Sequence, residues 1–255
     1  MKRFGLIGSP IGHSLSPQLF RAGYPLSADT YDLIEKETFE EAVSEFRSHY
    51  DAINVTAPFK ERAFLIADSS DSRTRFLKAT NLLVKESGGI RAYNTDCSAV
   101  EALLQKAASG LDHIPRVLVT GCGGAGKAAA LASASLNFPT GVANRDFCKA
   151  QNFCQASEWM EPLHLNLKEI SGFGFDILVH TLPLVTADIQ SLDLLGKIVI
   201  EANYRNPGLA PHEKKSGYKY IPGTEWLVGQ AASGFLIMTG EIPDMQNLSE
   251  FRTHL

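Results

Sequence analysis

The most constraining feature of the sequence is a cluster of glycines, Gly121–Gly126, between an apolar segment and an alanine-rich one. Val117–Thr120 favours a strand, and Lys127–Ala130 favours a helix. The order strand, tight turn and helix is typical of an α/β unit whose helix N-terminus binds a phosphate through backbone N–H groups. The residues predicted to bind a pyrophosphate here are Gly121, Gly123, Gly124 and Ala125.

The position of this cluster adds a second constraint, because a whole domain's length of chain precedes it. A chain of 255 residues fits one large domain or two of medium size. Its 44% hydrophobic and 20% charged residues are typical of a globular protein that can bury a sizeable core. The net charge of −4 gives no basic surface, so neither nucleic acid nor an anionic membrane is expected as a partner.

The cysteines and the apolar segments predict the cellular setting. Four cysteines without a C-x-x-C pair indicate reduced thiols and a cytoplasmic location. The apolar segment Phe4–Ile7 ends at once in Gly8, so it lacks the length of a signal peptide. No apolar run approaches the roughly 20 residues that span a bilayer. We therefore expect no membrane association.

The first part of the chain alternates strand-like and helical segments. Strands are expected at Phe4–Ile7, Tyr31–Ile34 and Ala52–Val55, and helical spacing of apolar residues covers Thr38–His49. Such alternation predicts a parallel sheet covered by helices. Ser98 and Glu101 have the spacing of a capping box, which predicts that a helix begins there.

The second part repeats this alternation after a linker at residues 109–115. Strands at Thr140–Ala143, Asp176–Val179 and Lys197–Ala202 predict a doubly wound sheet of the Rossmann type. A long helix from Glu225 to Thr239 is expected to return to the first domain. The predicted fold is therefore α/β with two domains: residues 1–97 plus 226–255 as a substrate-binding domain, and residues 98–225 as a dinucleotide-binding domain.

Polar residues gather where the strands of the first domain end, and ligands bind at that edge of α/β sheets. The four clusters are Gly8–Pro17, Asn54–Lys60, Ala79–Asn81 and Tyr93–Asp96. Read singly, each has a simple structural alternative. Ser16 before Pro17 is typical of a helix N-terminus, and Lys60 or Asp96 in a first helical turn is commonly only a surface charge.

Together with Gly121–Ala128 and Gly229–Ala232, these clusters resemble the shikimate dehydrogenase family in order and spacing over nearly the whole chain. The resemblance implies NADP-linked interconversion of 3-dehydroshikimate and shikimate, in the synthesis of chorismate and the aromatic amino acids. It implies that Ser14 and Ser16 bind the substrate carboxylate. The residues that it implies for the ring hydroxyls are Thr56, Asn81, Tyr204 and Gln230.

The resemblance also implies that Lys60 and Asp96 are the catalytic pair. Hydride delivery to a ketone creates an alkoxide, which must be protonated as it forms. An ammonium beside a carboxylate can stabilise that charge and transfer the proton. Lys60 is therefore the expected acid–base group, with Asp96 fixing its position.

The end of the second strand of the dinucleotide domain predicts the choice of cofactor. Asn144 and Arg145 match the family's Asn-Arg motif, in which arginine meets the 2′-phosphate of NADP. Asp146 replaces the family's hydroxyl residue, and Lys149 stands where a second arginine is common. A carboxylate repels a 2′-phosphate, so NADP is the expected cofactor, with a weakened preference and NAD as a second candidate. The histidines show no metal-binding spacing, and no metal is expected.

Several segments depart from the family pattern and keep alternatives open. His180–Val185 replaces an Asn-Ala-Thr-Pro-x-Gly motif near the expected nicotinamide position, and Tyr204–Pro207 is one residue longer than usual. One alternative is a quinate/shikimate-type dehydrogenase, or a paralogue acting on another cyclic hydroxy-acid. Another is a non-catalytic dinucleotide-binding protein. The small-molecule substrate is the expected partner, and the sequence is compatible with a monomer or a homodimer.

Overall fold

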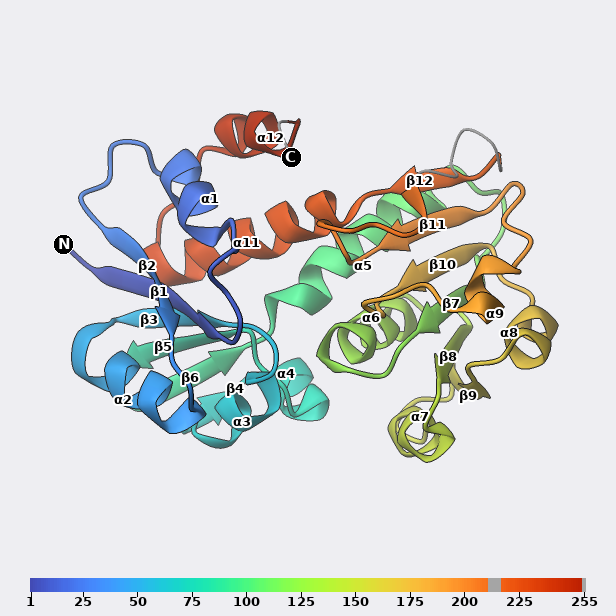
Figure 1. Ribbon diagram of the computed structural model, residues 1–255, viewed down its shortest axis with the longest axis horizontal. Coiled ribbons are helices and arrows are strands. Elements are labelled where there is room, and N and C mark those ends of the chain that lie inside the picture. Colours follow the sequence, from blue (N-terminus) through green and yellow to red (C-terminus); the bar gives the residue numbers. More distant parts are fainter. Residues whose placement is uncertain (211–216, 254–255) are drawn as a thin grey trace. The chain divides into compact units, whose positions relative to one another are not determined.

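The computed structural model describes residues 1–210 and 217–253 (Figure 1). It divides into two compact units. The N-terminal unit comprises Met1–Thr95 and Val228–Leu255, and the central unit comprises Asp96–Leu227.

The N-terminal unit is built on a mixed six-stranded sheet with the order β2-β1-β3-β5-β6-β4. Its strands are β1 (Arg3–Gly8), β2 (Thr30–Glu35), β3 (Ala52–Val55), β4 (Ser69–Ser70), β5 (Leu82–Glu86) and β6 (Gly89–Tyr93). β1 pairs in parallel with β2 and β3, whereas β5 pairs antiparallel with β3 and β6. The ends of β1 and β3 therefore meet at one edge, and the segments that follow them lie together.

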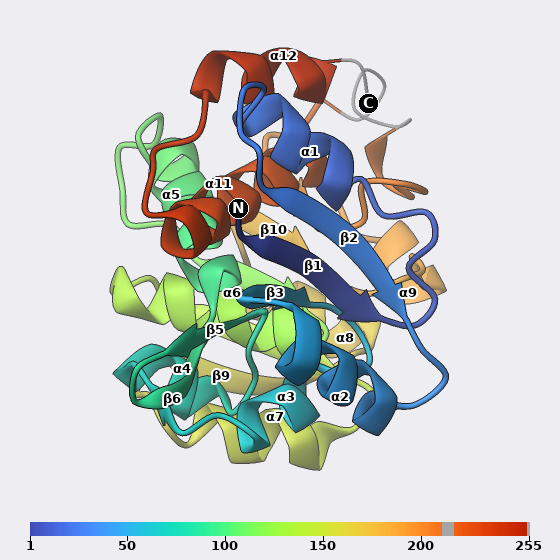
Figure 2. The same ribbon diagram turned by 90° about the vertical axis from the view of Figure 1, so that its left-hand side faces the viewer.

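Helices cover both faces of this sheet (Figure 2). They are α1 (Ser16–Gly23), α2 (Phe39–His49), α3 (Lys60–Leu65), α4 (Ser72–Leu77), α11 (Gly223–Thr239, shared with the central unit) and α12 (Met245–Thr253). On the side of α2 and α3, Phe46 and Phe59 pack with Ile7 and Ile53. On the side of α1 and α11, Phe20 lies 5.3 Å from Phe235, ring centre to ring centre, at 87°. The C-terminal part of α11 thus completes the core of the N-terminal unit.

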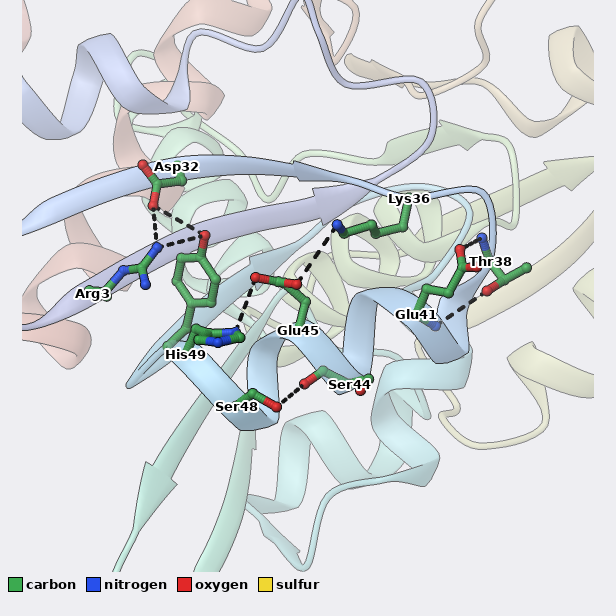
Figure 3. A network of polar contacts seen from close by, with 10 residues as sticks. Arg3, Asp32, Lys36, Thr38, Glu41, Ser44, Glu45, Ser48 and His49 are labelled. Atoms are coloured by element: carbon green, nitrogen blue, oxygen red, sulfur yellow. Dashed lines mark hydrogen bonds and ion pairs between the residues drawn. The ribbon is translucent and has the colours of Figure 1, made fainter.

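The start of α2 shows local sequence signals acting as expected. Thr38 accepts a bond from the Glu41 N–H, and the Glu41 carboxylate accepts one from the Thr38 N–H, which completes a capping box. Further along the helix, Glu45 pairs with Lys36 and His49 (Figure 3). These surface pairs add little to stability, so the helix is stabilised mainly by packing of its buried apolar face.

The central unit contains a six-stranded sheet that is parallel throughout, with the order β12-β11-β10-β7-β8-β9. Its strands are β7 (Val117–Thr120), β8 (Thr140–Asn144), β9 (Met160–His164), β10 (Ile177–His180), β11 (Ile198–Glu201) and β12 (Lys219–Ile221). Counted from β7, this is the Rossmann order 3-2-1-4-5-6. The predicted α/β fold class is confirmed.

The helices of the central unit are α5 (Thr95–Ala108), α6 (Gly124–Ser135), α7 (Phe147–Cys154), α8 (Leu167–Phe173) and α9 (Ala187–Gln190). Ile170, Phe173 and Ile189 pack with Leu178 and Val199 of the sheet. α6 buries alanines instead, which lets its backbone lie close to the strands.

The predicted start of α5 is wrong: the helix begins at Thr95 rather than at Ser98, because the Thr95 N–H already has an acceptor in the Asn81 side chain. Ser16 lies at the N-terminus of α1, as its place before Pro17 indicates, but it is the first helical residue, and Leu15 holds the N-cap position. In the described residues no helix combines the length and the apolar character needed to cross a membrane.

Candidate active site

The two predicted carboxylate-binding serines lie together at the end of the loop that follows β1. Their hydroxyl oxygens are 3.1 Å apart, and the Ser16 N–H donates to the Ser14 hydroxyl over 3.3 Å. Both residues are half-buried. Two adjacent neutral hydroxyls can donate to a carboxylate without a buried counter-charge, whose desolvation would be expensive.

A buried tyrosine connects these serines to the sheet. The Tyr31 hydroxyl hydrogen-bonds the Ser16 side chain and donates to Asn54 Oδ1 over 2.7 Å. Burial raises the pKa of Tyr31 well above its usual value, so the hydroxyl stays protonated. Neither Tyr31 nor Asn54 was among the predicted site residues. Asn54 begins the polar cluster Asn54–Lys60 of the sequence but was assigned no role, and Tyr31 resembles any core tyrosine.

Asn81 is the centre of the same network. Its side chain donates to Thr95 Oγ1 over 2.9 Å and to Gln230 Oε1 over 3.4 Å, and it accepts from the Thr95 N–H over 2.8 Å. Its carbonyl accepts from Asn54 Nδ2 over 3.1 Å. The Thr95 hydroxyl in turn donates to the Gln230 carbonyl over 2.9 Å. The structure therefore joins Ser14, Ser16, Asn81 and Gln230 through Tyr31, Asn54 and Thr95. Asn54 and Thr95 belong to the polar clusters of the sequence, but neither was assigned a role there.

Thr56 and Lys60 follow β3 at the same edge of the sheet. The Thr56 N–H donates to the Ile7 carbonyl over 2.9 Å, which continues the pairing of β3 with β1. Lys60 is the first residue of α3 and is half-buried, and its carbonyl accepts from the Thr80 N–H over 3.0 Å. The backbone of Lys60 is thus tied to the segment that carries Asn81.

Asp96 directly follows Thr95 in the chain and is only 6% exposed. One carboxylate oxygen accepts a bond from the indole N–H of Trp226 over 3.2 Å. Trp226 comes from α11 and is itself buried. Trp226 was missed by sequence reasoning, because its separation from Asp96 along the chain leaves no local pattern.

In the central unit the glycine cluster forms the predicted turn. Gly121 has φ +104°, and a Cβ there would lie 2.6 Å from Thr181 Oγ1. α6 then begins at Gly124 with Gly123 as its N-cap, and no side chain caps its first N–H groups. A Cβ on Gly123 would meet no atom within 4 Å. An uncapped helix start behind open space fits the pyrophosphate of a dinucleotide, which these N–H groups and the helix dipole would bind.

The predicted cofactor-discriminating residues lie between β8 and α7. Arg145 and Asp146 are exposed, and Asn144 donates to the Asp146 carbonyl over 3.0 Å. The Asp146 carboxylate accepts from the Lys149 N–H over 3.1 Å and is the N-cap of α7. Capping holds this carboxylate at the N-terminus of α7, one residue after Arg145.

His180 ends β10 and is 1% exposed. Its Nδ1 lies 2.9 Å from Thr120 Oγ1, and its Nε2 is buried with no hydrogen-bond partner among the described residues. Burial lowers the pKa of His180 to about 4, so the imidazole is neutral near pH 7. This is the first residue of the divergent segment, and its role was not predicted.

Tyr204 lies in the turn after β11. Burial raises the pKa of its hydroxyl, and the Arg205 guanidinium sits 5.4 Å from its ring centre. Arg205 Nη2 also donates to the Tyr204 hydroxyl over 3.3 Å. Within residues 1–210 and 217–253, no group of three or more His, Cys, Asp and Glu side chains is placed to hold a metal ion.

The central unit combines a sheet of Rossmann order with an uncapped glycine turn, and the N-terminal unit is a mixed α/β unit with a polar network. These features define a two-domain α/β protein of the dinucleotide-binding class. Residues 6–83 match the family model for the shikimate dehydrogenase substrate binding domain. The chain is 30% identical to the shikimate dehydrogenase (NADP(+)) of Histophilus somni, over 97% of both chains. It therefore belongs to the shikimate dehydrogenase family.

Solved structures agree on the fold. Quinate dehydrogenase from Corynebacterium glutamicum in complex with NAD is similar with a TM-score of 0.85 at 21% identity, over 100% of this chain and 99% of that one. Shikimate 5-dehydrogenase from Thermus thermophilus, in complex with NADP(H) and shikimate, is similar with a TM-score of 0.82 at 24% identity, over the same shares. The two neighbours act on different substrates, so the fold alone does not select between them.

Proposed function

We propose that this chain is an NADP-dependent shikimate dehydrogenase that interconverts 3-dehydroshikimate and shikimate. The observation that carries the proposal is the buried network linking Ser14, Ser16, Asn81 and Gln230. In a chain that matches a shikimate dehydrogenase end to end, this network gathers hydroxyls and amides suited to an acid with several ring hydroxyls.

Each side chain then has a defined task. Ser14 and Ser16 would donate to the substrate carboxylate. The amides of Asn81 and Gln230 would bind ring hydroxyls, because an amide can both donate and accept. Thr56 and Tyr204 would supply further hydroxyl contacts.

Lys60 would transfer the proton at the reacting oxygen. The nicotinamide, when bound, supplies or accepts the hydride. The Lys60 ammonium would stabilise the charge that develops on the substrate oxygen and protonate it. Asp96 would share this hydrogen-bond network, with the Trp226 indole N–H donating to one of its oxygens.

The central unit would hold the dinucleotide and the N-terminal unit the substrate. Gly121, Gly123, Gly124 and Ala125 would surround the pyrophosphate, while Arg145, supported by Asn144 and Lys149, would meet the 2′-phosphate. The Asp146 carboxylate would repel that phosphate and so reduce the preference for NADP over NAD. We further propose that the enzyme works in the cytoplasm as a monomer or homodimer, in the synthesis of chorismate and the aromatic amino acids.

A spectrophotometric assay of nicotinamide reduction tests these points together. Purified protein is given shikimate or quinate with NADP⁺ or NAD⁺, and kcat/KM is compared among the four combinations. The proposal predicts the highest value for shikimate with NADP⁺. Higher kcat/KM on quinate would make the chain a quinate/shikimate-type dehydrogenase. NADPH binding without turnover of either acid would point to another cyclic hydroxy-acid or to a non-catalytic protein, and would overturn the proposal.

A further inference from the structure

A buried carboxylate stands beside the Tyr204 turn and has no task in the proposed reaction. Glu201 is the last residue of β11 and is 1% exposed. A charge at such a position is tolerated only when hydrogen bonds replace its lost hydration. The groups that provide those bonds show what the residue does.

Among the described residues three donors contact this carboxylate, and two of them belong to the turn. Oε1 accepts from the Gly208 N–H over 2.7 Å, and Oε2 accepts from the Leu209 N–H over 3.2 Å. The Tyr220 hydroxyl of β12 donates to Oε2 over 2.8 Å. Glu201 therefore anchors the far end of residues 203–209, hereafter the Tyr204 turn, to the edge of the sheet.

The near end of the Tyr204 turn is held by Asn203. Its Oδ1 accepts from the Arg205 and Asn206 N–H groups, both over 3.2 Å. Its Nδ2 donates to the Asn206 carbonyl over 3.1 Å and to the Pro183 carbonyl over 3.4 Å. At the far end, a Cβ on Gly208 would collide with Val185. Both ends of the turn thus contact the segment His180–Val185, and the two departures from the family pattern form one packed structure.

We propose that Glu201 is a positioning residue: by fixing the Tyr204 turn, its carboxylate sets the place of the Tyr204 hydroxyl in substrate binding. The role of Tyr204 rests on the proposed function, whereas the anchoring of the turn does not. Glutamine at this position has one acceptor oxygen and one NH₂ group. The NH₂ group would face at least one donor of the turn, so an anchoring bond would be lost.

The test compares Glu201→Gln, Tyr204→Phe and the double variant with the unchanged protein. Glu201→Gln should raise KM for shikimate about fivefold and Tyr204→Phe about tenfold, which is the size of one lost neutral hydrogen bond. In the Tyr204→Phe background, Glu201→Gln should change KM less than about twofold, because residues that act through one group are not additive. If the KM increases of the two single variants multiply in the double variant, Glu201 acts independently of Tyr204, and the proposal is overturned.

Hydrogen exchange supplies a readout that needs no activity. The amides of Gly208 and Leu209 should exchange at least about tenfold faster in Glu201→Gln, because a buried acceptor is lost. Glu201→Asp, which keeps the charge, should restore part of the protection and of KM. The exposed Glu158→Gln is the matched control and should change neither quantity. Unaltered exchange at both amides would refute the anchoring role.

Two further outcomes remain decisive. If Glu201→Gln does not fold, Tyr220→Phe replaces it in the test, because it removes one donor from Glu201 Oε2. Tyr220→Phe should speed exchange of the Gly208 and Leu209 amides. It should raise KM for shikimate about twofold when residue 204 is tyrosine and leave it unchanged in the Tyr204→Phe background. If the unchanged protein turns over neither acid, the proposed function fails, and the exchange measurement alone decides whether Glu201 holds the turn.

Discussion

The two candidate binding regions are built in opposite ways. In the N-terminal unit the site consists of polar side chains that are bonded to one another, from Ser14 to Gln230. In the central unit it consists of backbone N–H groups at Gly123 and Gly124, and no side chain caps them. Removing a side-chain atom should therefore weaken binding at the N-terminal site, whereas adding one should weaken binding at the backbone site of the central unit. Substitutions of single atoms or groups can therefore separate them.

The largest effect is expected from removing Lys60, the side chain proposed to transfer the proton. Lys60→Met should lower kcat about 10³-fold, since general acid–base catalysis contributes 10²–10⁴-fold. NADPH affinity, measured by fluorescence titration, should change less than about twofold, because Lys60 lies in the N-terminal unit. Lys36→Met serves as the control, because Lys36 directly follows β2 and pairs with Glu45 of α2 at the surface. Near-normal turnover in Lys60→Met would exclude Lys60 as the acid–base group.

The glycine turn should respond to an added methyl group in two distinguishable ways. Gly121→Ala puts a Cβ at φ +104° against Thr181 and should reduce the free energy of unfolding by about 2 kcal/mol or more. Gly123→Ala adds its Cβ to open space and should leave that free energy within about 0.5 kcal/mol.

Cofactor binding should separate the same two glycines. Because the Gly123 methyl would stand between α6 and the pyrophosphate, Gly123→Ala should weaken NADPH binding at least about tenfold in a fully folded protein. Urea denaturation and cofactor titration on both variants check this. If Gly123→Ala binds NADPH normally, the uncapped start of α6 is not the pyrophosphate site.

His180 makes the stability of the central unit depend on pH. Its folded pKa of about 4 lies below the usual 6.5, so between these values the unfolded chain binds more protons. Stability is then complete above pH 6.5 and falls as the pH drops toward 4, by about 3 kcal/mol in all. His180→Asn should remove this part of the slope in denaturation curves at several pH values. Identical slopes in both proteins would show that His180 is not buried neutral.

Tyr31→Phe removes a single oxygen from the side-chain site. Asn54 Oδ1 and Ser16 then lose a partner, which should reduce the free energy of unfolding by about 1–2 kcal/mol and raise KM for shikimate several-fold. The KM for NADP⁺ should stay constant. Tyr50→Phe is the matched control, because that hydroxyl bonds the exposed Asp32 instead. A KM for shikimate equal to that of the control would disconnect Tyr31 from the substrate site.

What the sequence can predict follows the same division. The glycine turn is encoded locally, because φ at Gly121 and the close approach at Gly126 each demand a residue without a side chain. The side-chain network is encoded by contacts between distant segments. Thr95 was noted only as a member of the cluster Tyr93–Asp96 and Trp226 was not noted at all, because their partners Gln230 and Asp96 come from distant parts of the chain. The expected capping box at Ser98 failed for this reason: a long-range bond from Asn81 starts the helix earlier.

The smallest effect is expected at Asp146, a side chain in the candidate dinucleotide site of the central unit. Its carboxylate follows Arg145 in the chain, so it should repel a 2′-phosphate bound there. The same carboxylate caps α7, so an apolar residue at this position would also cost the helix its cap. Asp146→Ser keeps a capping oxygen and removes the charge. The ratio of kcat/KM for NADP⁺ over NAD⁺ should then rise about threefold, or about 0.6 kcal/mol, which is the size expected for an exposed charge pair. Asp146→Ala, which loses the cap as well, should show the same ratio with lower stability, and an unchanged ratio in both variants would mean that the carboxylate only caps the helix.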